Sequence, residues 1–210
     1  MSNSIVDELL GQLQGPMLGQ IAGQLGTDNA QAQDAITAAI PMIVGALGRN
    51  AQTPQGADDL FGALQRDHAA SSGGGMDLGG LLGSLLGGGA AMAPSRQLDG
   101  GGILGHIFGG AQPRAEEGLG QATGIGSDKS AQLLKILAPI VMGFLANKVM
   151  AGGMNSGGLG SMLGQERAQV QQQGGLGGTL MNAVLDQDGD GQVGLGDLLK
   201  MGATFLGGRR

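Results

Sequence analysis

The chemistry-bearing residues of this chain are concentrated near its C-terminus, in one aspartate-rich loop. Carboxylates stand at its first, third, fifth and twelfth positions, and a glycine follows the third of them. Hard oxygen ligands at these positions, with a backbone carbonyl at the seventh, form the ligand set of a calcium-binding loop. The sequence therefore predicts a calcium site whose ligands are Asp186, Asp188, Asp190, the carbonyl of Gln192, and Asp197.

Residues between and beside the ligands support this interpretation. Gly191 permits the sharp turn that the loop needs at its sixth position, and the apolar Val193 can pin the loop to a hydrophobic core. Apolar segments at 180–185 and 198–206 can form the entering and leaving helices. The alternative is an acidic turn that is merely rich in Asp and Gly. Carboxylates at all four expected positions favour the metal site.

The loop resembles an EF-hand and, with Asp197 opening the run D-L-L-K, is also similar to one calcium-binding half of a dockerin. An EF-hand usually closes with a longer Glu that binds bidentately, and both families usually pair two loops, whereas this chain shows one. These departures imply weak affinity, in the ~10⁻⁴ to 10⁻³ M class. Calcium binding is expected to order the terminal helices, because binding energy becomes folding energy when the empty site is unformed.

The remaining reactive side chains do not form a recognisable catalytic or cofactor site. Neither histidine has a third metal ligand nearby, neither glycine-flanked serine stands in a nucleophile elbow, and the glycine spacing misses the dinucleotide pattern. These groups are His68 and His106, Ser84 and Ser161, and Gly118, Gly120 and Gly124. The acidic pairs at 58–59 and 116–117 are interpreted as solvated faces. We predict no catalytic residue; a hydrolase would need Ser and His to converge in one pocket.

The elements that must carry the loop are organised around an internal repeat. Residues 136–145 read I-L-A-P-I-V-M-G-F-L, and residues 38–47, placed 98 positions earlier, read A-A-I-P-M-I-V-G-A-L. At this offset Pro41 aligns with Pro139. Apolar residues recur at helical spacing in both copies, so each predicts a long buried helix, and a kink or brief break is expected at Pro41.

Small polar residues indicate where four of the helices begin. Helix caps are expected at Ser4, at Thr27 or Asp28, at Thr53 and at Ser127.

The pattern predicts an all-α fold made of duplicated three-helix units that form a multihelical bundle. Each unit alone would bury little apolar surface, so the two are expected to pack together or against a second chain. The expected organisation is a first helical unit (1–67), a Gly/Leu-rich linker (68–102), a second helical unit (103–150), a flexible Gly/Gln-rich join (151–177) and an EF-hand-like hairpin (178–210). Within the join, residues 162–173 are expected to form a polar helix or coil.

The repeated arrangement resembles a known family. A proline preceded by A-I or L-A and followed four residues later by glycine comes after a helix stop and start, L-G-T-D in the first copy and T-G-I-G-S-D in the second. This arrangement, over residues 5–150, resembles a YidB-like bacterial family of unknown function. The resemblance implies an all-helical fold. It brings no established activity and no catalytic residues.

Composition excludes several classes of partner. A net charge of -6, no Trp or Tyr and four Phe disfavour nucleic acid, which needs cationic and aromatic contacts. There is no Cys, so no disulfide or thiolate site is expected. The longest apolar run, 136–146, is shorter than the ~20 residues of a transmembrane helix, so no membrane span is predicted. No secretory signal is evident, so a cytoplasmic location is the default, with export lacking a cleavable signal as the alternative.

Together these patterns predict a non-enzymatic helical interaction or scaffold protein whose C-terminal calcium loop stabilises or switches it. The partner is expected to be a protein of unknown identity, with a homo-oligomer as one form. The alternative is an exported or envelope-associated adhesion or assembly factor that depends on calcium, since cytosolic free calcium would hardly load a weak site.

Overall fold

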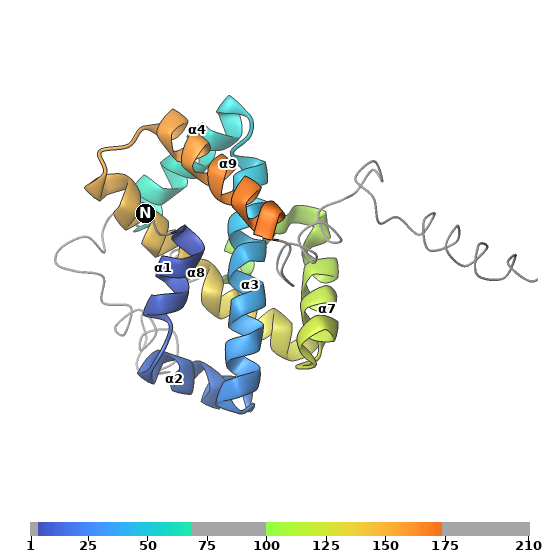
Figure 1. The fold of residues 1–210 in the computed structure, drawn as a ribbon. Helices are drawn as coiled ribbons and strands as arrows, with labels where there is room; N and C mark the ends of the chain where they lie inside the picture. Colours follow the sequence, from blue (N-terminus) through green and yellow to red (C-terminus); the bar gives the residue numbers. More distant parts are fainter. Residues whose placement is uncertain (1–3, 69–99, 174–210) are drawn as a thin grey trace, which may run out of the picture.

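A computed structural model describes residues 4–68 and 100–173 of the chain. All regular structure in these ranges is helical, with no strand, so the all-α prediction is confirmed for this part (Figure 1). The first range contains α1 (Ile5–Gln12), α2 (Pro16–Leu25), α3 (Asn29–Asn50), α4 (Pro54–Ala63) and the π-helical turn η1 (Leu64–His68). The second contains α6 (Gly100–Phe108), the 3-10 turn η4 (Gly109–Ala111), α7 (Gln112–Thr123), α8 (Ser127–Ala151) and α9 (Ser156–Gln173).

Side-chain caps fix where several helices begin. Ser4 accepts a hydrogen bond from the Asp7 backbone N–H at 3.1 Å, and Asp28 accepts one from Gln31 at 2.8 Å. Thr53 caps α4 in the same way. These interactions satisfy N–H groups that have no intrahelical partner, so the starts predicted at Ser4, at Asp28 and at Thr53 are confirmed.

The start of α8 differs from the prediction in detail. Its N-cap is Gly126, whose φ of 82° lies in the region that favours glycine, and Ser127 is the first helical residue. Ser127 was expected to cap the helix. Instead Ser130, one turn further on, donates its hydroxyl hydrogen to the Gly126 carbonyl at 2.8 Å.

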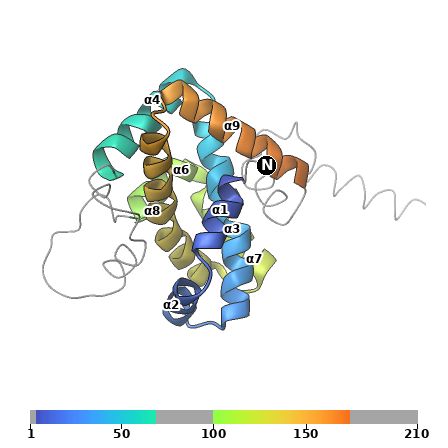
Figure 2. The same cartoon turned by 60° about the vertical axis from the view of Figure 1, so that its left-hand side comes forward.

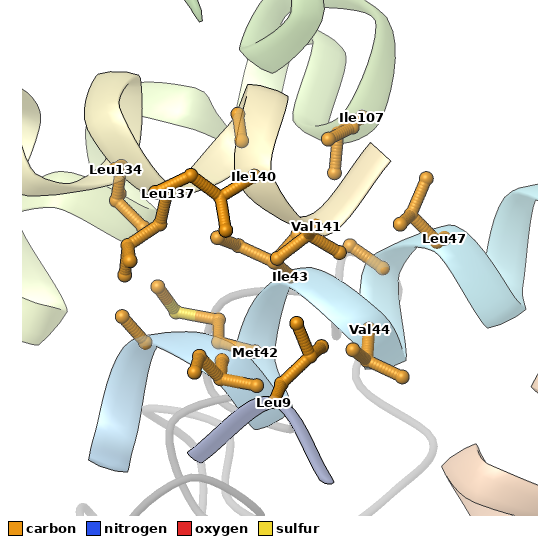
Figure 3. Packing of buried hydrophobic residues seen from close by; sticks show 14 of the residues in the cluster. Leu9, Met42, Ile43, Val44, Leu47, Ile107, Leu134, Leu137, Ile140 and Val141 are labelled. Carbon is orange, nitrogen blue, oxygen red and sulfur yellow. The ribbon is translucent and has the colours of Figure 1, made fainter. Parts of the chain in front are cut away.

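The two long helices lie at the centre of the molecule. α3 contacts α1, α2, α6, α7, α8 and α9, and α8 contacts α2, α3, α6, α7 and η1 (Figures 1 and 2). Every residue from Ala38 to Gly48 is buried except Pro41, and every residue from Ile136 to Ala146 is buried. Figure 3 shows side chains of both helices meeting with Leu9 of α1 and Ile107 of α6 in one core. This arrangement agrees with the prediction that 136–145 forms a central helix.

The prolines do not interrupt these helices. Pro41 lies inside α3 and Pro139 inside α8, and both helices continue through them, so the brief break expected as one outcome does not occur. Each proline leaves the carbonyl four residues earlier without its usual donor. In α8 that carbonyl belongs to Lys135, and the start of α6 packs against it: a Cβ on Gly100 would lie 2.0 Å from its oxygen.

Two segments expected to be joins belong to helices. Residues 100–102, placed in the linker, open α6, and α9 occupies much of the span 151–177. Leu159 and Leu163 of α9 are fully buried against the core. The four glycines of α9 lower helix propensity, which explains the expectation of a flexible segment. The helix is held instead by its contacts with α3 and α4, where it crosses the top of the bundle in Figure 1.

The crossing of α3 and α9 predicts the effect of a single methyl group. A Cβ at Gly48 would lie 2.8 Å from the backbone oxygen of Leu163, so Gly48→Ala must push the helices apart. Overpacking costs about 1–3 kcal/mol, and better helix propensity returns about 1 kcal/mol, so we expect a net loss of up to ~2 kcal/mol in the free energy of unfolding. Urea unfolding followed by circular dichroism measures it.

Gly19→Ala is the matched control. Gly19 lies inside α2, is exposed, and has nothing within 4 Å of its would-be Cβ. This substitution should raise the free energy of unfolding by roughly 0.5–1 kcal/mol, because only the backbone entropy of the unfolded chain changes. Equal effects of the two substitutions would show that α9 does not pack closely on Gly48.

Candidate functional site

The predicted calcium ligands lie outside the described residues. Asp186, Asp188, Asp190, Gln192 and Asp197 fall in the C-terminal part of the chain, beyond α9. The calcium site therefore stays a prediction from spacing. Within 4–68 and 100–173, no group of three or more His, Asp or Glu side chains lies close enough to hold a metal ion.

A cavity of about 380 Å³ lies where α4 and α9 begin. Its lining combines the first turns of both helices with the loop before α4: Ala51, Gln52, Thr53, Pro54, Ala57, Asp58, Ser156, Gly157, Gly160 and Ser161. Two of the three hydroxyl groups in this lining bond to the backbone, since Thr53 accepts from the Gly56 N–H and Ser161 donates to the Gly157 carbonyl; the third belongs to Ser156. Asp58 is the one ionisable residue of this lining. The cavity can admit small polar molecules, but it offers no activated nucleophile.

A second cavity, of about 60 Å³, lies between α1, α2 and α3. Leucine, isoleucine and threonine side chains line it together with two glutamines, Gln14 and Gln33. No charged group faces it. Its size and lining are those of a packing defect between helices.

The other side chains singled out in the sequence are dispersed. Ser161 lines the larger cavity, and His106 is exposed on α6 and is not part of that lining. Asp58 and Asp59 are exposed as expected, whereas Glu116 is half-buried and accepts a hydrogen bond from Gln112 at 2.8 Å. Ser84 and the side chain of His68 lie outside what the structure describes.

Glu166 is a buried charged residue that no motif or spacing in the sequence indicated. It lies on α9 and is 9% exposed. Its Oε1 accepts a hydrogen bond from the backbone N–H of Ile5, the first residue of α1, at 3.0 Å. A carboxylate at this end of a helix satisfies an orphan N–H group and is favoured by the helix dipole. Glu166 thus ties the last described helix to the first.

This tie is only partly satisfied. The Oε2 atom of Glu166 and the Nε atom of the neighbouring Arg167 are buried with no hydrogen-bond partner among the described residues. Leaving buried polar atoms unpaired costs about 1–3 kcal/mol each, and more for charged groups. The docking of α9 therefore depends on its own apolar side chains: Leu159, Leu163 and Val170 are buried against the core.

Two polar contacts join the ends of the long helices to α1 and α6. Lys148 of α8 forms an ion pair with Glu8 of α1, and its ammonium lies 5.5 Å from the centre of the Phe144 ring. Asn50 of α3 donates through its Nδ2 to the carbonyls of His106 and Ile107, at 3.2 and 3.0 Å. The first contact is partly exposed and so contributes at most ~1 kcal/mol. Both fix the positions of α1 and α6 over the core.

α8 is long and apolar enough to cross a membrane by length and composition, although no span was predicted. Its mean hydropathy over the most apolar window is 1.6, and 78% of that window is buried inside the fold. Core helices of globular proteins pass the same test when they are covered on several sides. The burial of α8 by its neighbours accounts for its apolar character.

Comparison with known proteins identifies a family for this chain. A family model described as "Bacterial protein of unknown function (DUF937)" matches residues 7–148, which is more than half of the chain and runs from α1 into α8. No curated protein and no solved structure matches the chain. The matched range excludes α9 and the predicted calcium loop.

The Glu166 contact predicts an ordered pair of substitutions. Glu166→Gln keeps an oxygen that can accept from the Ile5 N–H, whereas Glu166→Ala leaves that buried N–H without a partner. We expect the free energy of unfolding of the alanine variant to be about 1–2 kcal/mol lower than that of the glutamine variant. Guanidinium titrations of both measure the difference. Indistinguishable stabilities would mean that the carboxylate does not cap α1.

Proposed function

We propose that this chain, which belongs to the DUF937 family of bacterial proteins of unknown function, is a non-enzymatic helical interaction or scaffold protein with a calcium-binding C-terminal loop. The spacing of Asp186, Asp188, Asp190 and Asp197 carries this proposal. Carboxylates at these four loop positions form a ligand set for calcium, and the loop follows a helical core that can serve as its platform.

The loop is proposed to act by ordering apolar surface. Leucine, methionine and valine residues flank it at 180–185 and 198–206. Without an ion, the crowded carboxylates repel one another. Calcium neutralises them and favours the paired helices, which gathers the flanking apolar side chains into one surface. Such a surface would bind a protein partner only in the calcium-loaded state.

The structure of the core supports a platform role. Its apolar residues are mostly buried or packed half-buried against the core, and Met150 is the only large hydrophobic side chain that is exposed among the described residues. In the larger cavity, the hydroxyl groups of Thr53 and Ser161 are already bonded to the backbone. These features favour a structural part over a reaction centre.

We further propose that the core is built from duplicated three-helix units, α1 to α3 and α6 to α8, and that the YidB-like resemblance refers to this same family. Two observations support the duplication. Pro41 and Pro139 occupy the same place in the two long helices, and α2 and α7 both end at a glycine with positive φ, Gly26 (60°) and Gly124 (72°). Left-handed glycines are common helix stops, so the coincidence of position matters more than their presence.

An exported or envelope-associated adhesion or assembly factor is the second candidate. The closing residue Asp197 is shorter than the usual Glu, and a single loop gives weak binding, which suits a calcium-rich surrounding. Fractionation of the native cell distinguishes the candidates. Recovery of the protein from the cytosol alone would exclude the second.

Calcium binding is tested by isothermal titration calorimetry. The wild-type chain should take up calcium, and the double variant Asp186→Asn, Asp190→Asn should not, because two of the four carboxylate ligands are neutralised. The matched control is Asp58→Asn, Asp59→Asn, which removes the same charge from an exposed pair on α4 and should leave uptake unchanged. Equal heats for wild type and the loop variant would refute the site.

The proposed switch predicts a change in structure and in binding. Saturating calcium should raise the helical circular dichroism signal of the wild-type chain, while the loop variant stays unchanged. Affinity capture from the native host should then recover a partner with calcium and lose it with a chelator. If wild type and the loop variant recover a partner equally, the protein binds a partner but calcium does not control that binding.

A further inference from the structure

The two halves of the fold make the same contacts with their roles exchanged. Asn50 near the end of α3 reaches residue 106 in α6, and Lys148 near the end of α8 reaches residue 8 in α1. Positions 50 and 148 differ by 98, and so do positions 8 and 106. Position 50 of the first copy contacts position 106 of the second, and the equivalent positions, 148 and 8, make the same contact in the reverse direction. A contact that two copies make reciprocally is isologous and marks a two-fold axis.

Burial follows the same rule along the long helices. α3 begins at Asn29 and α8 at Ser127, again 98 positions apart. At this offset, each buried position of α3 corresponds to a buried position of α8. The one difference in buried positions within the aligned helices is the proline, since Pro41 is half-buried and its equivalent Pro139 is buried. Ile43 and Val141 are equivalent residues, and both lie where α3 and α8 meet (Figure 3).

The relation extends to a fourth element in each half. In the first half α4 and η1 follow α3, and in the second half α9 follows α8. Leu60 and Leu64 are four residues apart, as are Leu159 and Leu163. The connection between α8 and α9 is one residue longer than its counterpart, so these leucines align at an offset of 99. Leu64 and Leu163 are both fully buried. The three-helix repeat thus becomes a four-element repeat that includes α9.

These fourth elements cross over to the opposite half. η1 packs on α8, α9 packs on α3, and α4 and α9 pack on each other. The second helices also cross, because α2 contacts α8 and α7 contacts α3. Figures 1 and 2 both show α9 lying across α3, next to α4, at one end of the bundle. Each half therefore covers the long helix of the other.

We propose that residues 4–68 and 100–173 are two copies of one four-element unit, joined as an exchanged two-fold pair within a single chain. The partner that each unit's apolar face fits is a second copy of the same unit. Neither unit is complete alone, because parts of its long helix are covered by the fourth and second elements of the other. This relation is independent of whether the C-terminal loop binds calcium.

Cutting the connection tests the dependence of the halves. One protease recognition sequence is inserted within residues 69–99 of the full chain, and the folded protein is cut. The two fragments should elute together from a sizing column at micromolar concentration. The urea midpoint of the cut protein should rise with protein concentration, whereas that of the uncut chain stays fixed, because folding has become an association.

Two results of this experiment would overturn the proposal. One is separation of the fragments on the column. The other is an unfolding midpoint of the cut protein that does not depend on concentration, since independently folded halves need no partner to stay folded. Circular dichroism of separated fragments then shows which half retains helix alone.

A double-mutant cycle tests the two-fold relation itself. Asn50→Lys with His106→Glu places in one half the residue types that form the Glu8–Lys148 ion pair in the other. The folding equilibrium constant of the double variant should exceed the value expected from the two single variants by roughly two-fold, and salt should reduce the excess. Asn50→Lys with Gly105→Glu is the mismatched control, because its acid is one position out of register on an exposed part of α6. Equal coupling in both pairs, or none in the first, would contradict the equivalence.

Discussion

The mutual burial of α3 and α8 is the constraint that determines where the other helices lie. The central stretches 38–48 of α3 and 136–146 of α8 are buried on nearly all sides, so each long helix needs covering elements there as well as its partner. Short helices supply this cover: α1, α2, α6 and α7 lie along the sides, and α4 and α9 close one end. The two central prolines persist because the packing around them holds the helices together despite a lost hydrogen bond.

Local signals allowed much of this fold to be predicted from the sequence. Ser4 and Thr53 cap helices, as expected of hydroxyl residues that stand just before a helical segment. The run from Ile136 to Leu145 is buried, as its apolar composition indicates. For α9 the prediction stayed open between helix and coil over 162–173 and missed the first turns, because glycines weaken the helical signal and contacts with other helices hold α9 in place. Gly126 displaced Ser127 as a cap for a similar reason: its backbone conformation has no signature in the side-chain pattern.

The functional candidates also separate into those that a local sequence pattern indicates and those that only the structure shows. The predicted calcium ligands share one short loop, so a calcium site can be proposed from their spacing alone, without knowledge of the rest of the chain. The clamp between Glu166 and Ile5 joins residues 161 positions apart, and a single glutamate in a glutamine-rich stretch indicates nothing about such a partner. The exchanged contacts at 50–106 and 8–148 become meaningful only when the repeat offset is combined with the geometry.

That clamp also bears on how the chain is made. The ribosome synthesises α1 first, yet the carboxylate that completes its first turn is synthesised with α9, after every other described helix. Until then α3 also lacks the helix that crosses it, so a nascent first half exposes apolar surface that its own sequence cannot cover. The chain therefore reaches its native packing only after α9 has been synthesised. During that interval, neighbouring ribosomes on one message would bring matching unfinished units close together.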